Sequence, residues 1–288
     1  MLRHVALATY EGAPDLSPDD QALLPQLARL GLTVRAEVWS DVTVDWASFD
    51  AVIVRSCWDY HLRIGEFRAW LERLETLGLV VLNSPALIRW NADKRYLLDL
   101  ARRGVTTIPT LVVSSERGDD VAPVAVAEGW EHIVIKPTIS ASGYETYALA
   151  APFDATSRAY VARATSVGDV LVQPFVPEIP RDGEYSFTFI DGAFSHATIK
   201  RAASHEFRVQ TEHGGSVSPT GAPASLVAQA AQAIEVLSET PLYARVDGIA
   251  RGDTFLLMEL ELIEPNLFLE HGAGAAELLA RAIERRLR

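Results

Sequence analysis

Short apolar runs of strand length alternate with amphipathic helix patterns along the first part of the chain. The predicted strands lie at 2–10, 32–39, 51–54 and 79–82, and the predicted helices lie at 17–31 and 64–77. Ser17 is a suitable N-cap for the first helix, and Gly31 and Gly78 end the two helices, where glycine is favoured. Strands that alternate with helices in this way predict a parallel sheet with crossover helices.

The remaining chain combines helix patterns with longer alternating strands. Helices are predicted at about 91–103, 154–164, 223–238 and 273–287, and strands at about 108–113, 131–136, 169–173, 184–190, 193–200, 243–250 and 254–263. The polar segments 118–120 and 211–223 are predicted to be loops. Pro174, Pro177 and Pro180 are predicted to keep the chain extended. We therefore expect an α/β (α+β) protein.

The composition favours a globular protein that does not bind polyanionic surfaces. The 288 residues are 49% hydrophobic, enough for one or two cores, and carry a formal net charge of −12. This charge argues against nucleic acid and anionic membrane as partners. The single Cys57 has no disulfide partner and is expected to be a small buried thiol rather than a nucleophile. The chain shows no basic-then-apolar leader and no long apolar run, so we expect a soluble, cytoplasmic protein.

Only three of the 26 basic residues are lysines, namely Lys94, Lys136 and Lys200. A GC-rich coding sequence would produce this bias by drift, because Lys and Arg are nearly equivalent on a solvated surface. Where a site needs a compact ammonium group on a flexible stem, however, Arg is not a substitute. Each lysine is therefore a candidate site residue.

Two segments that follow predicted strands offer groups suited to a nucleotide. Lys136 precedes a small, hydroxyl-rich turn at 137–144, whose N–H groups and hydroxyls can bind phosphate oxygens. The segment 172–178 offers main-chain groups to an adenine edge, with Glu178 within reach of a ribose. The alternatives are an ordinary hairpin with a surface lysine and a Pro-rich interdomain linker.

Asp247, Glu259 and Glu261 form the strongest constellation. Alternation puts the two glutamates on one face of their strand, and the turn at 252–253 places Asp247 across from them. Like charges this close are unfavourable unless a cation lies between them, and oxygen ligands suit Mg²⁺. The alternative is a solvent-facing polar side of an antiparallel pair. The segment 264–266 follows and could supply a further ligand or a substrate contact.

The run from Arg55 to His61 follows a predicted buried strand. Ligands collect at the carboxyl ends of strands in open α/β sheets, and this run suits an amino-acid-like substrate. Arg55 would bind the substrate carboxylate and Asp59 its ammonium group. The alternative is that Trp58 and Tyr60 pack in a domain interface.

These residues resemble the ATP-grasp superfamily, specifically its glutathione-synthetase and ribosomal-protein-S6-ligase-like branch. The resemblance covers roughly residues 83–270 and rests on Lys94, on Lys136 with its Ser/Gly loop, on Gln173–Val176 and on the three carboxylates. It implies an N-terminal domain at 1–85 and two α+β subdomains, 86–168 and 169–288, that clamp ATP. The family usually has Asn where this chain has Glu261, which keeps an oxygen ligand but adds a negative charge.

The resemblance implies ATP and Mg²⁺ (or Mn²⁺) as cofactors. It implies that Lys94 and Lys136 hold the phosphates, that Gln173, Phe175 and Val176 meet the adenine and Glu178 the ribose, and that Asp247 and Glu259 hold the metal. Together with the positions argued from the residues themselves, these give the following expected roles. The residues expected to bind ATP are Lys94, Lys136, Ser140, Ser142, Gly143, Gln173, Phe175, Val176 and Glu178, and those expected to bind metal are Asp247, Glu259 and Glu261. The cations expected to surround the transferring γ-phosphate are Lys200, Arg208 and Arg245. The residues expected to face the substrate are Arg55, Ser56, Asp59, Tyr60, His213, Gly214 and Asn266. Surface charge is the alternative for Lys200 and Arg208, and a solvated loop position is the alternative for His213.

The expected activity is that of an ATP-dependent ligase acting on a small amino-acid-like substrate. The substrate carboxylate is activated as an acyl phosphate, and an amine then attacks it, giving an amide-type bond, ADP and phosphate without any side-chain nucleophile. The segment 55–60 and the short chain look most similar to a family member in which amine and carboxylate belong to one molecule. The alternatives are an intermolecular amino-acid or peptide ligase and a non-catalytic ATP-binding module. We expect neither nucleic acid nor membrane as a partner, and the sequence is compatible with a homodimer.

Overall fold

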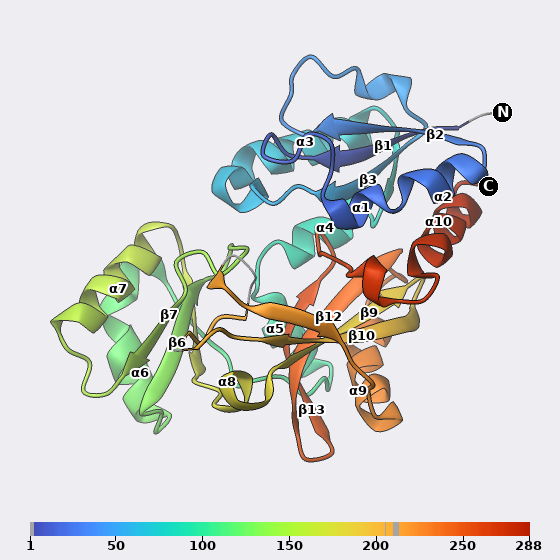
Figure 1. The fold of residues 1–288 in the computed structure, drawn as a ribbon. Coiled ribbons are helices and arrows are strands. Elements are labelled where there is room, and N and C mark those ends of the chain that lie inside the picture. Colours follow the sequence, from blue (N-terminus) through green and yellow to red (C-terminus); the bar gives the residue numbers. More distant parts are fainter. Residues whose placement is uncertain (1–2, 205, 210–212) are drawn as a thin grey trace.

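The computed structural model describes residues 3–204, 206–209 and 213–288, and its strands form three sheets (Figure 1). The N-terminal sheet has the order β2-β1-β3-β4 and is parallel, as predicted. Its strands are β1 (Arg3–Thr9), β2 (Leu32–Val38), β3 (Ala51–Ser56) and β4 (Val80–Leu82). The helices of this part are α1 (Pro18–Gln21), α2 (Leu24–Arg29) and α3 (Ile64–Thr76), with short 3₁₀ turns at Trp46–Ser48 and Tyr60–Arg63.

The single helix predicted at 17–31 is wrong, because the chain forms α1 and α2 instead. Pro25 lies in the first turn of α2, where its missing N–H group costs nothing, but it cannot continue a helix that starts at Pro18. One face of the N-terminal sheet packs against α2 and against α10 (Ala275–Arg286), so the end of the chain returns to the N-terminal core (Figure 1). The other face is covered by α3 and by the buried aromatic side chains of Trp39, Trp46 and Trp70.

The central sheet is antiparallel, with the order β5-β8-β6-β7. Its strands are β5 (Leu111–Val113), β6 (His132–Pro137), β7 (Tyr147–Ala150) and β8 (Val170–Pro174), and α6 (Val121–Ala127) and α7 (Ala155–Ser166) pack against it. This sheet therefore extends beyond the expected subdomain boundary at 168. The loop predicted at 118–120 is wrong, because a 3₁₀ turn at Ser115–Asp120 leads into α6, which the burial of Val121 and Ala125 stabilises.

The C-terminal sheet is antiparallel, with the order β11-β10-β9-β12-β13. Its strands are β9 (Glu184–Ile190), β10 (Ala193–Arg201), β11 (Ser216–Pro219), β12 (Tyr243–Arg251) and β13 (Thr254–Glu261). Its apolar face packs against α9 (Ala224–Glu235), α4 (Pro85–Asn91) and α5 (Tyr96–Arg102). A 3₁₀ turn at Leu269–His271 precedes α10.

Three further predictions need correction in this half of the chain. Strand β11 lies inside the loop predicted at 211–223, part of which falls outside the described residues. The extended chain predicted through Pro180 instead forms α8 (Glu178–Asp182), since proline is tolerated in a first helical turn. The helix predicted at 91–103 starts too early, because α4 ends at Asn91 and α5 begins only at Tyr96. The segment between them carries Lys94, whose N–H donates to the Thr138 carbonyl at 2.7 Å.

No helix of the described residues is both long enough and apolar enough to cross a lipid bilayer.

Candidate active site

A cavity of about 390 Å³ lies between the central sheet and the polar face of the C-terminal sheet, and the segment after β3 forms part of its wall. All three lysines of the chain line it, together with two arginines: Lys94, Lys136, Lys200, Arg208 and Arg245. This concentration of positive charge in a protein of net charge −12 suits a small polyanion.

One part of the cavity is apolar and suits a flat ring. Ile108, Val176 and Met258 line it and belong to a small hydrophobic cluster beneath the polar face of the sheet. The Gln173 side chain is fixed there, because its Nε2 donates to the Thr110 hydroxyl at 2.8 Å. Gln173, Phe175 and Val176 therefore all line the cavity, where the adenine was expected to bind.

The phosphate-binding candidates lie beside this apolar part. Lys94 Nζ donates to the Ser140 carbonyl and pairs with Glu259 Oε1 at 2.9 Å. Lys136 forms no ion pair with any described residue, and burial lowers its pKa. Ser140, Ser142 and Gly143 all line the cavity, and the last two have positive φ angles that turn the loop back toward β7. Lys136 is therefore a partly buried lysine that no described carboxylate pairs with, and an anionic ligand would supply the missing partner.

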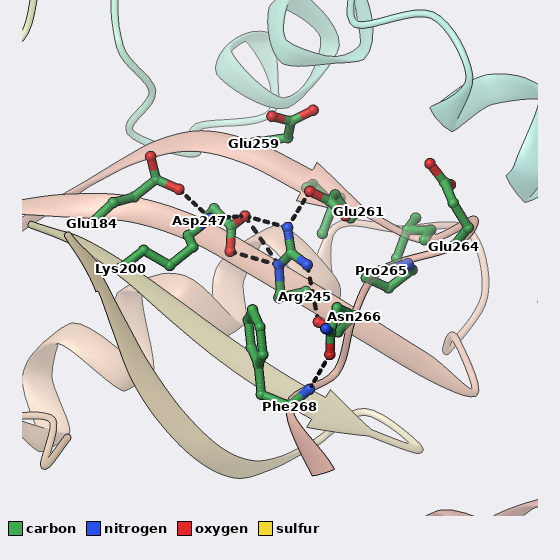
Figure 2. Close-up of polar contacts among 12 residues, drawn as sticks. Glu184, Lys200, Arg245, Asp247, Glu259, Glu261, Glu264, Pro265, Asn266 and Phe268 are labelled. Atoms are coloured by element: carbon green, nitrogen blue, oxygen red, sulfur yellow. Dashed lines mark hydrogen bonds and ion pairs between the residues drawn. The ribbon is translucent and has the colours of Figure 1, made fainter. Parts of the chain in front are cut away.

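A network of ion pairs covers the polar face of the C-terminal sheet (Figure 2). Lys200 Nζ lies 2.8 Å from Asp247 Oδ2 and also pairs with Glu184. Arg245 Nη2 lies 2.9 Å from Asp247 Oδ2 and also pairs with Glu261. Burial alone would raise the pKa of Asp247, but the two cations hold it well below its usual range. This network is therefore rigid and strongly charged.

The three carboxylates proposed as metal ligands do not form one group here. Among the residues that the structure describes, no three His, Cys, Asp or Glu side chains are close enough to hold an ion together. Each carboxylate has a cationic partner instead of a shared metal ion: Lys94 for Glu259, Lys200 and Arg245 for Asp247, and Arg245 for Glu261.

The donor set nevertheless fits a divalent cation. Asp247 and Glu259 are directly opposite each other in the β12–β13 ladder, and Glu261 lies opposite Arg245 on the same face. Burial and the neighbouring carboxylates raise the pKa of Glu261 to about 7, so the negative charge is not fully compensated. Carboxylate oxygens are the preferred ligands of such ions. Ligation by these three residues stays a prediction.

The cavity wall beyond these carboxylates comes from the segment 264–268. Glu264, Asn266 and Phe268 line the cavity, as do Trp58 and Tyr60 from the N-terminal domain. Arg245 Nη1 donates to the Asn266 carbonyl at 2.9 Å, and the Phe268 N–H donates to Asn266 Oδ1 at 3.0 Å (Figure 2). Phe268 has a φ of 54°, a left-handed conformation that is strained for an aromatic residue. Sequence reasoning missed Phe268 and Glu184, because neither carries a local signal.

Three residues expected to bind the substrate are behind the cavity wall instead of in it. Arg55 is 1% exposed, and its Nε lies 2.7 Å from Asp20 Oδ1 in a buried ion pair. Ser56 is fully buried and donates to the same carboxylate. Asp59 accepts hydrogen bonds from Trp39 at 2.7 Å and from Arg63 at 3.0 Å. The assignment of Arg55, Ser56 and Asp59 to the substrate is therefore wrong, because Asp20 on α1 holds the first two and Trp39 and Arg63 hold the third.

Other candidates have mixed positions. Cys57 is fully buried and burial raises its pKa, which confirms the expected inert thiol. Glu178 does not line the cavity, and its carboxylate is paired with Arg251 Nε at 2.8 Å. His213 and Gly214 are also absent from the cavity lining. Arg208 lines the cavity and is paired with Glu206 at 2.8 Å.

Comparison with solved structures identifies the class of protein. D-alanine–D-alanine ligase from Bacillus anthracis, in its complex with ATP, superposes with a TM-score of 0.72 at 15% identity over 99% of this chain and 97% of that chain. The fold is that of the ATP-grasp enzymes, and the protein is an ATP-dependent ligase that forms an amide-type bond with release of ADP and phosphate. ATP and a divalent metal are its cofactors.

Closer relatives define the family. A family model described as the N-terminal domain of D-cycloserine synthetase DcsG matches residues 5–83. Cycloserine biosynthesis protein DcsG from Streptomyces lavendulae is 32% identical over 297 residues, which cover 99% of each chain. The crystal structure of D-cycloserine synthetase DcsG superposes with a TM-score of 0.90 at 30% identity over 99% of this chain and 100% of that chain. The chain belongs to the DcsG family of ATP-grasp ligases.

Proposed function

We propose that the protein closes O-ureido-D-serine to D-cycloserine in a reaction driven by ATP, as a step of antibiotic biosynthesis in the cytoplasm. Family membership supports this substrate, because the relative that matches the whole chain is a cycloserine biosynthesis protein. The observation that carries the proposal is that one cavity is lined by all three lysines and also by aromatic and carboxylate side chains. The lysines suit the phosphates of ATP, and the aromatic and carboxylate groups suit a small amino acid.

ATP binds with its adenine between the apolar side chains at Ile108, Val176 and Met258. Its phosphates then meet Lys94, Lys136 and the loop 140–143, where charge-assisted hydrogen bonds are strong. Asp247, Glu259 and Glu261 would hold Mg²⁺, which would supply positive charge to the phosphates.

The substrate carboxylate attacks the γ-phosphorus atom and forms an acyl phosphate, with ADP as the leaving group. Lys200, Arg208 and Arg245 neutralise the charge that develops on the transferred group, which is the main catalytic term in phosphoryl transfer. The ureido nitrogen bonded to oxygen then attacks the acyl carbon, forms the ring C–N bond and displaces phosphate. Water cleaves the bond between this nitrogen and its carbamoyl group, which leaves as CO₂ and ammonia and gives D-cycloserine. No side-chain nucleophile takes part, so the cavity acts by holding one molecule in a reactive conformation.

The test is phosphate release with ATP, Mg²⁺ and O-ureido-D-serine, with product identification by mass spectrometry. We expect release to depend on the substrate and to match the amount of D-cycloserine. Release that requires two different amino acids would show an intermolecular ligase instead. ATP binding without release for any amino acid would show a non-catalytic module. Replacing Mg²⁺ by Mn²⁺ in the same assay decides between the two metals.

A further inference from the structure

Glu264 has no part in the function proposed above, on which the following inference rests. Its side chain lines the cavity, yet it forms no hydrogen bond or ion pair with another side chain in the described ranges. Figure 2 shows its carboxyl group apart from the connected network of Lys200, Asp247 and Arg245. Each of the other cavity carboxylates has a cationic partner, so Glu264 differs from all of them.

The position of Glu264 places it at the substrate end of the cavity. Strand β13 runs along the cavity wall, from Met258 in the apolar part through Glu259 and Glu261 opposite the cations. Strand β13 ends at Glu261, and the chain then bends, so Glu264 follows the strand carboxylates in the cavity lining. Figure 2 shows it beyond Glu261, on the side away from Glu184 and Lys200.

The N-terminal domain holds the backbone around Glu264 in place. Trp58 Nε1 donates to the Glu264 carbonyl at 3.0 Å, and Arg55 Nη2 donates to the Pro265 carbonyl at 2.8 Å. Asp19 accepts from the N–H groups of Leu267 at 2.9 Å and Leu269 at 2.6 Å. Four side-chain hydrogen bonds thus fix the backbone from which the Glu264 side chain extends.

The surroundings of the carboxyl group suit an organic cation. Trp58 and Tyr60 line the same cavity, and aromatic rings attract ammonium groups. The nearest cation that acts on Glu264 is Lys94, which is already paired with Glu259. Burial and the charge of Glu261 raise the pKa of Glu264 to about 8. The negative charge of this carboxylate is therefore not balanced by a cation in the ligand-free protein.

We propose that Glu264 is the specificity-determining residue that binds the ammonium group of the amino-acid substrate, with Trp58 and Tyr60 beside it. The substrate is thereby oriented with its ammonium group at Glu264 and its carboxylate toward Lys200 and Arg245. The enzyme selects amino acids over carboxylic acids of the same shape, because only an ammonium group supplies the missing cation.

The test compares O-ureido-D-serine with 3-(ureidooxy)propanoate, which lacks only the amino group, in the wild type and in Glu264→Gln. The variant is expected to lose about 10- to 100-fold in kcat/KM for O-ureido-D-serine, the range for a hydrogen bond to a charged group. The value for the deamino compound is expected to change less than about threefold and the KM for ATP less than about twofold, since neither involves the lost charge. Glu264→Asp keeps the charge and is expected to recover part of the preference.

The matched control is Glu270→Gln, an exposed glutamate on the same segment, which is expected to behave as the wild type. An equal loss for both compounds, or no loss for either, overturns the assignment of Glu264. Calorimetry with D-serine and 3-hydroxypropanoate in the presence of ADP and Mg²⁺ gives a second readout. If the wild type releases no phosphate with O-ureido-D-serine, the proposed function fails. The calorimetry then tests the role of Glu264 separately: loss of the preference for D-serine over 3-hydroxypropanoate in Glu264→Gln supports it, and an unchanged preference overturns it.

Discussion

Lys136 and Lys94 offer a contrast that tests the phosphate-binding assignment. Both lysines line the cavity, but Lys94 is paired with Glu259 whereas Lys136 has no ion-pair partner among the described residues. We consider the substitution of each by Met, which keeps the length of the apolar stem and removes the charge. Burial lowers the pKa of Lys136, so its charge is unfavourable in the ligand-free protein.

The magnitudes follow from these surroundings. Two unit charges 4 Å apart attract by about 4 kcal/mol at the effective dielectric constant of a protein surface, before desolvation is subtracted. A hydrogen bond to a charged group contributes about 1.5–3 kcal/mol net, so Lys136→Met is expected to weaken ATP binding by about 10- to 150-fold. Its melting temperature is expected to equal or exceed that of the wild type. Lys94→Met leaves the partly buried Glu259 without its ion-pair partner, which is expected to cost about 1–3 kcal/mol of stability.

Isothermal titration with ATP and Mg²⁺, together with thermal unfolding of the ligand-free proteins, measures both effects. The reasoning predicts a stable Lys136→Met variant with weak ATP binding and a destabilised Lys94→Met variant. Tight ATP binding by Lys136→Met would refute the phosphate role of this lysine. A large drop in its melting temperature would refute the claim that its charge is uncompensated.

Three further predictions concern the substrate end and its support. Arg55→Met leaves Asp20 buried without its partner, so urea unfolding should show a loss of about 3–5 kcal/mol; a normal stability with only a raised substrate KM would return Arg55 to the substrate site. The folded-state pKa of Glu264 is about 8 against an ordinary value of 4.5, so folded protein keeps a proton that the unfolded chain releases, and stability falls as pH rises through this window. Glu264→Gln should therefore melt higher than the wild type at pH 8.5 and nearly the same at pH 4.5; a lower melting temperature at both values would contradict this. Trp58→Phe removes the N–H group that holds the Glu264 carbonyl, so kcat/KM for the amino-acid substrate should fall about tenfold while the Kd for ATP is unchanged in calorimetry; equal losses for both ligands would argue against a positioning role.

Much of the fold could be predicted because its signals are local. The parallel N-terminal sheet follows from apolar runs alternating with helices that have identifiable caps, and the β12–β13 pair follows from alternation around a two-residue turn. The errors occur where tertiary packing decides the structure. Helix α6 has no clear polar face, and the burial of Val121 and Ala125 against the central sheet stabilises it. Strand β11 is a four-residue segment with two serines and a proline, and it exists because it pairs with the edge of β10.

The cavity could be predicted in part for a similar reason. The scarcity of lysine singled out three residues that all line it, which is a property of the composition and needs no knowledge of distant contacts. The failure at Arg55 has a non-local cause, since its partners are Asp20 on α1 and the carbonyl of Pro265, 210 residues away. Glu264 could be named only as part of a segment, because its lack of a partner is visible only in three dimensions.

The central claim is that the substrate carboxylate is phosphorylated by ATP before the C–N bond forms. The most direct measurement uses O-ureido-D-serine with ¹⁸O in both carboxylate oxygens and analyses the released phosphate by mass spectrometry. In the proposed mechanism one carboxylate oxygen bridges carbon and phosphorus and leaves with the phosphate. We expect one ¹⁸O atom in each phosphate released per D-cycloserine formed. Unlabelled phosphate accompanying the same product would contradict it.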